Sequence, residues 1–153
     1  MDKIVFITGA SSGIGAGCAR KFASQGASLI LNARNVNKLS ALKEELEKQY
    51  GAKIYLLPFD VRDRKAATSA LESLPKEWQS IDILVNNAGL VIGTDKEQEG
   101  SLDEWDIVID TNIKALLAMT RLIVPGMVER KRGHIINIGS IAGEDRKSTR
   151  LNS

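Results

Sequence analysis

The nine residues ITGASSGIG, at positions 7–15, decide what this chain can fold into. They follow an apolar run at residues 3–8 (KIVFIT) that predicts a strand, and they lead into a segment that predicts a helix. Gly9 allows a sharp turn off the strand, Gly13 lets the backbone approach a phosphate, and Gly15 lets the helix pack closely on a sheet.

The same turn predicts a phosphate-binding site, because the free amides and the positive dipole end of a helix attract anions. Ser11 and Ser12 can add hydroxyl donors. The spacing is G-x-x-x-G-x-G rather than the commoner G-x-G-x-x-G, so a simple capped turn stays open as the alternative. The candidate cofactor-binding residues of the turn are Gly9, Ser11, Ser12, Gly13, Ile14 and Gly15.

Four further apolar runs predict strands, at residues 28–33 (SLILNA), 53–59 (KIYLLPF), 81–86 (IDILVN) and 134–139 (HIINIG). None alternates strictly, which is typical of strands buried on both faces. Helical patterns separate the runs, at residues 38–50 (with Leu39, Leu42 and Leu46 spaced for one face), 63–74 and 111–128. Alternating strands and helices predict an α/β fold, a Rossmann-type doubly wound parallel sheet. By local rules, Pro125–Gly126 should kink or break the last helix.

Composition predicts one soluble domain of 153 residues with a net charge of +2, too small to indicate a nucleic-acid or membrane partner. The single cysteine, Cys18, forms no internal disulfide and is expected to be a buried or half-buried filler. No signal peptide or membrane span is seen, which favours the cytoplasm, and no metal site is identified. We expect the basic run 130–132 to complement a helix end capped by Gly133; a phosphate-binding patch is the alternative.

Arg34 follows the second predicted strand, and no acidic residue occurs after it until Glu44. A carboxylate at this place would bind the ribose 2′-hydroxyl of NAD, whereas an arginine can hold the 2′-phosphate of NADP. The sequence therefore favours NADP over NAD. A solvated arginine stays open as the alternative, since Asn35 supplies no second cation.

TGASSGIG (8–15), FDVRD (59–63), DILVNNAG (82–89) and HIINIGSIAG (134–143), in this order, resemble the short-chain dehydrogenase/reductase (SDR) family from residue 1 to about residue 144. The resemblance implies the first five strands of a seven-stranded fold. It implies adenine contacts for Asp60 and Val61, and ribose contacts for Asn87, Ala88 and Gly89. Asn112 matches the family's asparagine that holds a helix distortion and a proton-relay water. Ser140 matches the serine that hydrogen-bonds the substrate carbonyl. The alternatives are a turn residue (Asp60, Ser140) and a helix start (Asn112).

Longer phrases at 73–90 and 109–140 are similar to NADP-dependent 3-hydroxy acid dehydrogenases. That branch oxidises serine and related 3-hydroxy acids or reduces malonic semialdehyde, and it carries Pro-Gly inside one long helix, which we expect here. Two alternatives stay open: a catalytically inactive NADP-binding module, and a reductase of another carbonyl substrate. Family members assemble partly through the helix predicted at 111–128, so the intact parent is expected to be a homo-oligomer and this chain to hold half of that interface.

The family's proton donor is a tyrosine with a lysine four residues later, roughly 13 residues after Ser140. The chain contains only Tyr50 and Tyr55, and no Y-x-x-x-K. Residues 145–153 (DRKSTRLNS) translate a DNA string that resembles a sequencing-library adapter. We therefore interpret 1–144 as an incomplete NAD(P)-binding Rossmann domain and 145–153 as a non-native tail, with a natural truncated paralogue as the alternative. We expect the chain to be inactive as an enzyme.

Overall fold

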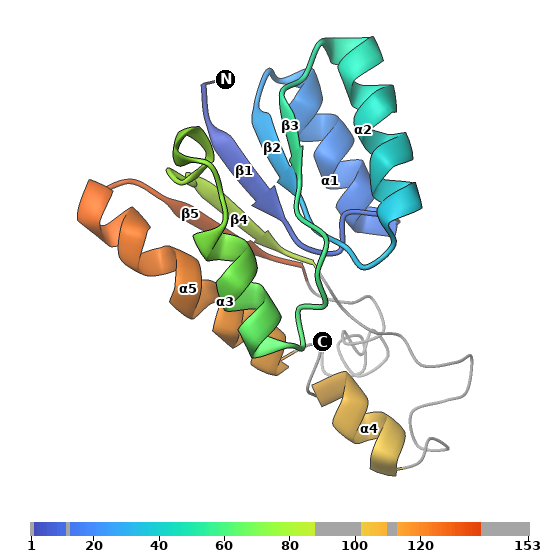
Figure 1. Cartoon of the computed structure of the whole chain (residues 1–153), viewed down its shortest axis with the longest axis vertical. Coiled ribbons are helices and arrows are strands. Elements are labelled where there is room, and N and C mark those ends of the chain that lie inside the picture. Colours follow the sequence, from blue (N-terminus) through green and yellow to red (C-terminus); the bar gives the residue numbers. More distant parts are fainter. Residues whose placement is uncertain (1, 12, 88–101, 110–112, 139–153) are drawn as a thin grey trace, which may run out of the picture.

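Five parallel strands form one sheet in the computed structural model, which describes residues 2–11, 13–87, 102–109 and 113–138 (Figure 1). The strands are β1 (Ile4–Ile7), β2 (Ser28–Leu31), β3 (Ile54–Leu56), β4 (Ile83–Asn86) and β5 (His134–Asn137). Their order is β3-β2-β1-β4-β5, so the chain winds outward from β1 in one direction and then in the other. This order confirms the predicted Rossmann-type doubly wound sheet.

Helices cover both faces of this sheet. The described helices are α1 (Gly13–Ser24), α2 (Val36–Tyr50), α3 (Arg64–Glu72), the short 3₁₀ helix η1 (Lys76–Trp78), α4 (Leu102–Ile109) and α5 (Ala115–Arg130), of which α4 lies away from the sheet. The pair α1 and α2 lies over one face, and the pair α3 and α5 over the other (Figure 1). The sequence patterns did not predict α4. Among the described helices, none combines the length and the apolar character needed to cross a bilayer.

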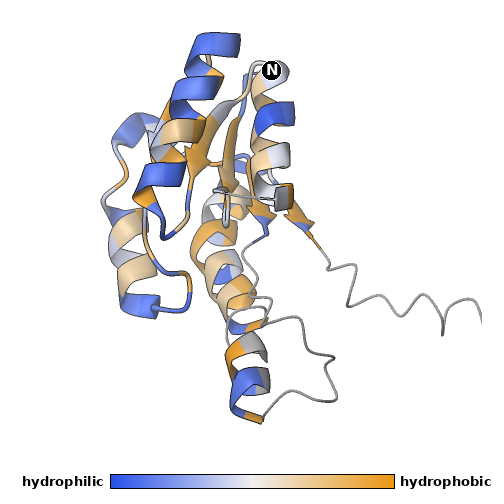
Figure 2. Ribbon diagram, turned by 90° about the vertical axis from the view of Figure 1, so that its right-hand side faces the viewer, coloured by the Kyte–Doolittle hydropathy of each residue, from blue (hydrophilic) through white to orange (hydrophobic). Residues whose placement is uncertain are grey.

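Neighbouring residues of the central strands enter two different hydrophobic cores. Val5 and Ile7 pack with α1 and α2, whereas Phe6 packs with α3 and α5, and all three are fully buried. Figure 2 shows these apolar strands beside helices that carry both hydrophilic and hydrophobic residues. Burial of both faces explains why the strand sequences lack a polar alternation. Cys18 is half-buried against the first core, as predicted, and this burial raises the pKa of its thiol.

The start and the end of α2 are set by side-chain and backbone caps. The Asn35 side chain accepts a hydrogen bond from the Lys38 amide (3.0 Å), and Gly51 ends the helix in the left-handed conformation (φ 63°). The three leucines of the predicted apolar face are all buried: Leu39, Leu42 and Leu46. Asn35 therefore caps α2 and adds no positive charge beside Arg34.

The helix α5 runs through Pro125 without ending, so the local expectation of a break is wrong and the expectation from the family resemblance is confirmed. A π-helical turn at Ile113 and Lys114 precedes it. The predicted glycine cap is also wrong: Lys131, not Gly133, adopts the left-handed conformation (φ 55°). Gly133 is needed for space instead, because a Cβ there would lie 2.5 Å from the Met127 sulfur.

The basic run 130–132 acts within the fold. Arg130 Nη2 donates to the carbonyl of Ile81 (2.7 Å), and Arg132 Nε lies 2.7 Å from Asp82 Oδ1. The other carboxylate oxygen of Asp82 accepts a hydrogen bond from the Ile4 amide (2.9 Å). The end of α5 is thereby attached to the starts of β4 and β1, which argues against the alternative of a phosphate-binding patch.

The strand β5 departs from the prediction of burial on both faces. His134, Ile135 and Asn137 are exposed, and Ile136 is half-buried. In the described part of the chain β5 pairs with β4 alone, so it forms one edge of the sheet.

Leu46→Ala is expected to lower the free energy of unfolding by about 2–5 kcal/mol, because it removes a fully buried side chain between α2 and the sheet. Glu44→Ala, on the exposed side of the same helix, should change it by less than about 0.5 kcal/mol. Urea unfolding followed by far-ultraviolet circular dichroism measures both; equal effects would contradict the assignment of this core.

Candidate dinucleotide-binding site

The candidate site lies at the carboxyl ends of the strands, where the strand order reverses between β1 and β4. From this point one connection leads from β1 through α1 to β2, and β4 lies on the other side of β1. Loops that leave adjacent strands in opposite directions open a crevice, the usual ligand position in doubly wound sheets. The glycine-rich turn, Arg34, Asp60 and Asn87 all follow strands at this end of the sheet.

The glycine-rich turn has the backbone that its sequence predicts. Gly9 and Gly13 adopt left-handed conformations (φ 61° and 59°), and α1 begins at Gly13. A Cβ built on Gly13 would meet no atom within 4 Å, so the backbone there borders open space. Gly15 is the opposite case: a Cβ there would collide with the carbonyl oxygen of Gly9 and lie 2.5 Å from the Asn87 side-chain nitrogen.

Asn87 attaches the turn to the end of β4. Its amide donates to the Thr8 hydroxyl (2.9 Å), and its side-chain nitrogen donates to the carbonyl of Gly9 (3.0 Å). The Thr8 amide donates to the carbonyl of Val85 (3.1 Å), which adds a backbone link at the same place. The first turn of α1 is therefore held against β4 with its amides directed at the crevice.

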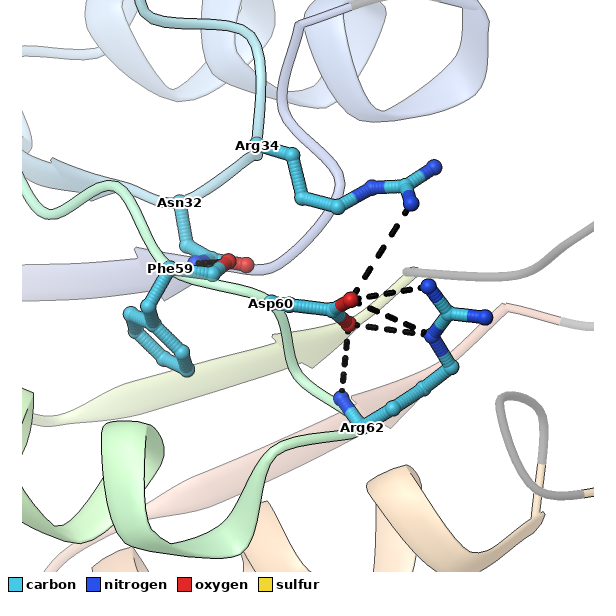
Figure 3. Close-up of polar contacts among 5 residues, drawn as sticks. All are labelled: Asn32, Arg34, Phe59, Asp60 and Arg62. Atoms are coloured by element: carbon cyan, nitrogen blue, oxygen red, sulfur yellow. Dashed lines mark hydrogen bonds and ion pairs between the residues drawn. The ribbon is translucent and has the colours of Figure 1, made fainter.

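Asn32 makes a second attachment, which sequence reasoning missed. Its buried side-chain nitrogen donates to the carbonyls of Leu57 (3.1 Å) and Phe59 (3.0 Å). The backbone carbonyl of Asn32 accepts from the Ala10 amide (2.8 Å). It thus connects the glycine-rich turn to the segment before Asp60 (Figure 3). The available signal was a polar amide residue ending an otherwise apolar run, SLILN, where a buried asparagine needs partners.

Two arginines approach the Asp60 carboxylate from different elements (Figure 3). Arg62 binds it closely, with Nη2 2.8 Å from Oδ2, while Arg34 Nη1 lies 4.0 Å from Oδ2. The hydrogen bonds from Arg62, with a smaller contribution from the charge of Arg34, hold the pKa of Asp60 below its usual range. Val61 beside it is buried.

These residues fit an NADP molecule. The open space at Gly13 suits a pyrophosphate, and so do the first amides of α1, which have no partner within the helix. The Arg34 side chain is 63% exposed and extends from the end of β2 beside the turn, so it can reach a 2′-phosphate. Two guanidinium groups face one carboxylate here, which leaves the site with a positive balance for a phosphorylated ligand.

The sequence of the chain matches the family model described as short chain dehydrogenase, over residues 3–151. The chain belongs to the short-chain dehydrogenase family.

Several members of the family are similar to it. The NADP-dependent 3-hydroxy acid dehydrogenase YdfG of Escherichia coli strain K12 is 49% identical over 140 residues, 92% of this chain and 55% of the relative. Sulfoacetaldehyde reductase 2 of Chromohalobacter salexigens is 42% identical over 145 residues, 94% of this chain and 57% of the relative. The solved structure of the closed form of serine dehydrogenase complexed with NADP⁺ has a TM-score of 0.80 and 48% identity, with 92% of this chain and 55% of that chain covered. The chain spans about half the length of the curated relatives it matches.

Several residues expected in the site of this short-chain dehydrogenase lie outside the described residues: Ser12, Ala88, Gly89, Asn112 and Ser140. The structure brings together the others, namely Gly9, Ser11, Gly13, Ile14, Gly15, Arg34, Asp60, Val61 and Asn87. Asp60 also behaves as the turn residue that was its alternative, because its Oδ1 accepts from the Arg62 amide (2.9 Å). The turn bond uses Oδ1 alone, so it is compatible with the expected adenine contact of Asp60.

Gly15→Ala is expected to destabilise this short-chain dehydrogenase chain by about 1–3 kcal/mol and to weaken nucleotide binding, because the new methyl group would force α1 away from Gly9 and Asn87. Gly17→Ala is the matched control: a Cβ there meets nothing within 4 Å, and the change should stabilise α1 by up to about 1 kcal/mol. Thermal unfolding of both variants is the measurement. A tolerated alanine at position 15 would show that this close approach is not required.

Proposed function

We propose that this chain carries the cofactor-binding part of an NADP-dependent oxidoreductase that transfers a hydride between the nicotinamide and a small 3-hydroxy acid or 3-oxo acid. One observation carries the proposal: the glycine-rich turn is held open at the switch point of the sheet, with the exposed Arg34 guanidinium beside it. A relative that is 49% identical is named an NADP-dependent 3-hydroxy acid dehydrogenase, and this supports the substrate class.

The proposed contacts divide the cofactor among three strand ends. The turn from Gly9 to Gly15 holds the pyrophosphate, and Arg34 holds the 2′-phosphate through paired charge-assisted hydrogen bonds. Asp60 and Val61 border the adenine. Asn87, with Ala88 and Gly89, lines the ribose; its side-chain bond to the carbonyl of Gly9 keeps this wall in place.

When bound, NADP supplies the hydride acceptor or donor at its nicotinamide ring. Ser140 is proposed to hydrogen-bond the substrate carbonyl, and Asn112 to hold a water that relays the proton. The π-helical turn at Ile113 and Lys114 lies directly after Asn112 and supports a helix distortion at that place. General acid-base chemistry also needs a tyrosine beside a lysine, and the 153 residues contain no Y-x-x-x-K. We therefore propose that the 153-residue polypeptide binds NADP but does not turn over.

Two other functions have a specific observation in their favour. A catalytically inactive NADP-binding module fits a chain whose tyrosines are only Tyr50 and Tyr55, outside the site. A reductase of another carbonyl compound fits the 42% identity to sulfoacetaldehyde reductase 2. The proposed 3-hydroxy acid activity is favoured because the identity to the relative of that name is higher.

Arg34→Ala is expected to weaken NADPH binding by about 10- to 100-fold, because it removes charge-assisted hydrogen bonds to the 2′-phosphate. Binding of NADH, which lacks this phosphate, should hardly change. Arg20→Ala is the control, since Arg20 pairs with Glu45 (2.7 Å) on the outside of α1 and α2. Isothermal titration calorimetry measures NADPH and NADH binding by the wild type and by both variants. Equal losses of NADPH and NADH affinity in Arg34→Ala would overturn the assignment of Arg34.

The catalytic proposal is tested by assaying NADP-linked oxidation of L-serine and 3-hydroxypropionate. We expect no activity from the 153-residue polypeptide, and activity from residues 1–144 joined to the continuation of the same gene. Turnover by the 153-residue polypeptide would overturn the proposed need for the tyrosine and lysine. NADPH binding without activity in either polypeptide would favour the inactive module.

A further inference from the structure

Arg62 holds the carboxylate of Asp60 with four hydrogen bonds (Figure 3). Its backbone amide donates to Oδ1 (2.9 Å), Nε donates to Oδ1 (3.1 Å) and Oδ2 (3.2 Å), and Nη2 donates to Oδ2 (2.8 Å). This two-pronged geometry fixes the plane of the carboxylate as well as its charge. Arg62 is adjacent to Val61 in FDVRD, but no function was predicted for it from the sequence.

The backbone around Asp60 is fixed without this side-chain pair. Phe59, before it, is bound by the buried Asn32, and the carbonyl of Asp60 accepts from the Asp63 amide (2.9 Å). Asp63 then caps α3 by accepting from the Ala66 amide (3.1 Å). The pairing of Arg62 with Asp60 is therefore not needed to hold this backbone, and a partly exposed ion pair contributes little to stability.

The carboxylate itself is directed at the site. Oδ2 is the oxygen nearer to Arg34, and the Asp60 side chain is one-third exposed, so a ligand can reach it. Arg62 Nε shares a single proton between the two oxygens (3.1 and 3.2 Å), and Arg34 Nη1 is 4.0 Å from Oδ2, so Oδ2 keeps acceptor capacity for one further donor such as an amino group. Without the Arg62 guanidinium, only the backbone amide of residue 62 would hold Oδ1, and rotation about that bond could move Oδ2 away.

We propose that Arg62 is a positioning residue for base recognition: it holds Asp60 ionised and oriented so that the carboxylate accepts a hydrogen bond from the exocyclic amino group of adenine. This inference rests on the proposed NADP function and assigns the part of the site that reads the base. It distinguishes adenine from hypoxanthine, which carries a carbonyl oxygen at C6 in place of the amino group. The carboxylate that accepts from the adenine amino group would then face an acceptor at C6, and the only donor on that edge of the base would be the ring N1–H.

The test measures binding of NADPH and of its hypoxanthine analogue to the 153-residue chain by isothermal titration calorimetry. Arg62→Ala should weaken NADPH binding about 10-fold and leave the analogue nearly unchanged. In an Asp60→Asn background, the same substitution should cause no further loss, because Arg62 acts through Asp60. Arg62→Lys, which keeps the charge but not the paired geometry, should fall between. Arg64→Ala, which changes an exposed arginine of the neighbouring α3, is the control.

A second readout does not depend on the cofactor. In wild type the pKa of Asp60 is lowered, so the charged acceptor persists as the pH falls towards that pKa. Arg62→Ala should raise the pKa of Asp60, seen by carboxyl NMR titration, and should move the acid loss of NADPH binding to higher pH. This measurement also shows whether the variant is folded.

The possible outcomes separate the two proposals. If wild type binds no NADPH, the proposed function fails and this inference fails with it. If wild type binds and Arg62→Ala weakens NADPH and the hypoxanthine analogue equally, or changes neither, the proposed function survives and the role of Arg62 is overturned. Selective loss of NADPH binding together with a raised Asp60 pKa supports it.

Discussion

The structure depends on one close approach, that of α1 to the ends of β1 and β4. At Gly15 a methyl group would collide with the carbonyl of Gly9, so the helix can start at this place only where the side chain is a hydrogen atom. The consequence is that the free amides of the first helical turn lie at the switch point of the sheet. The anion-binding property of the site is thus a direct result of packing.

Buried amide side chains hold the rest of the site around that approach. Asn87 joins the turn to β4, and Asn32 joins it to the chain before Asp60. Asn86 adds a third link, since its side-chain nitrogen donates to Asn137 on β5 (3.1 Å) and to the Thr120 hydroxyl on α5 (3.3 Å). Amides suit this task because they provide donors and an acceptor without burying a charge.

Charges in the chain divide into those that serve the fold and those that face the crevice. Arg130 and Arg132 bind Ile81 and Asp82 just before β4, at the opposite end of the strands from the turn, and Asp82 in turn accepts from the first residue of β1. Arg34 and Arg62 lie at the carboxyl ends, where two cations share one carboxylate. The chain as a whole has a small net charge, but the carboxyl ends of the strands carry an excess of positive charge. The position of each arginine along the strands decides whether it binds the fold or faces the crevice.

The sequence alone predicted the five strands, a doubly wound parallel sheet, the apolar face of α2 and a sharp turn at Gly9, because these follow from local periodicity and from backbone sterics. It also indicated Arg34 and Asp60 as site residues. Tertiary structure decided what depends on partners distant in sequence: the linking role of Asn32, the grip of Arg62 on the carboxylate and the structural use of the basic run. It also placed the left-handed cap of α5 at Lys131, and it uses Gly133 for close packing against Met127. Local patterns carry backbone preferences, whereas the use of a polar side chain depends on which donors and acceptors folding brings within reach.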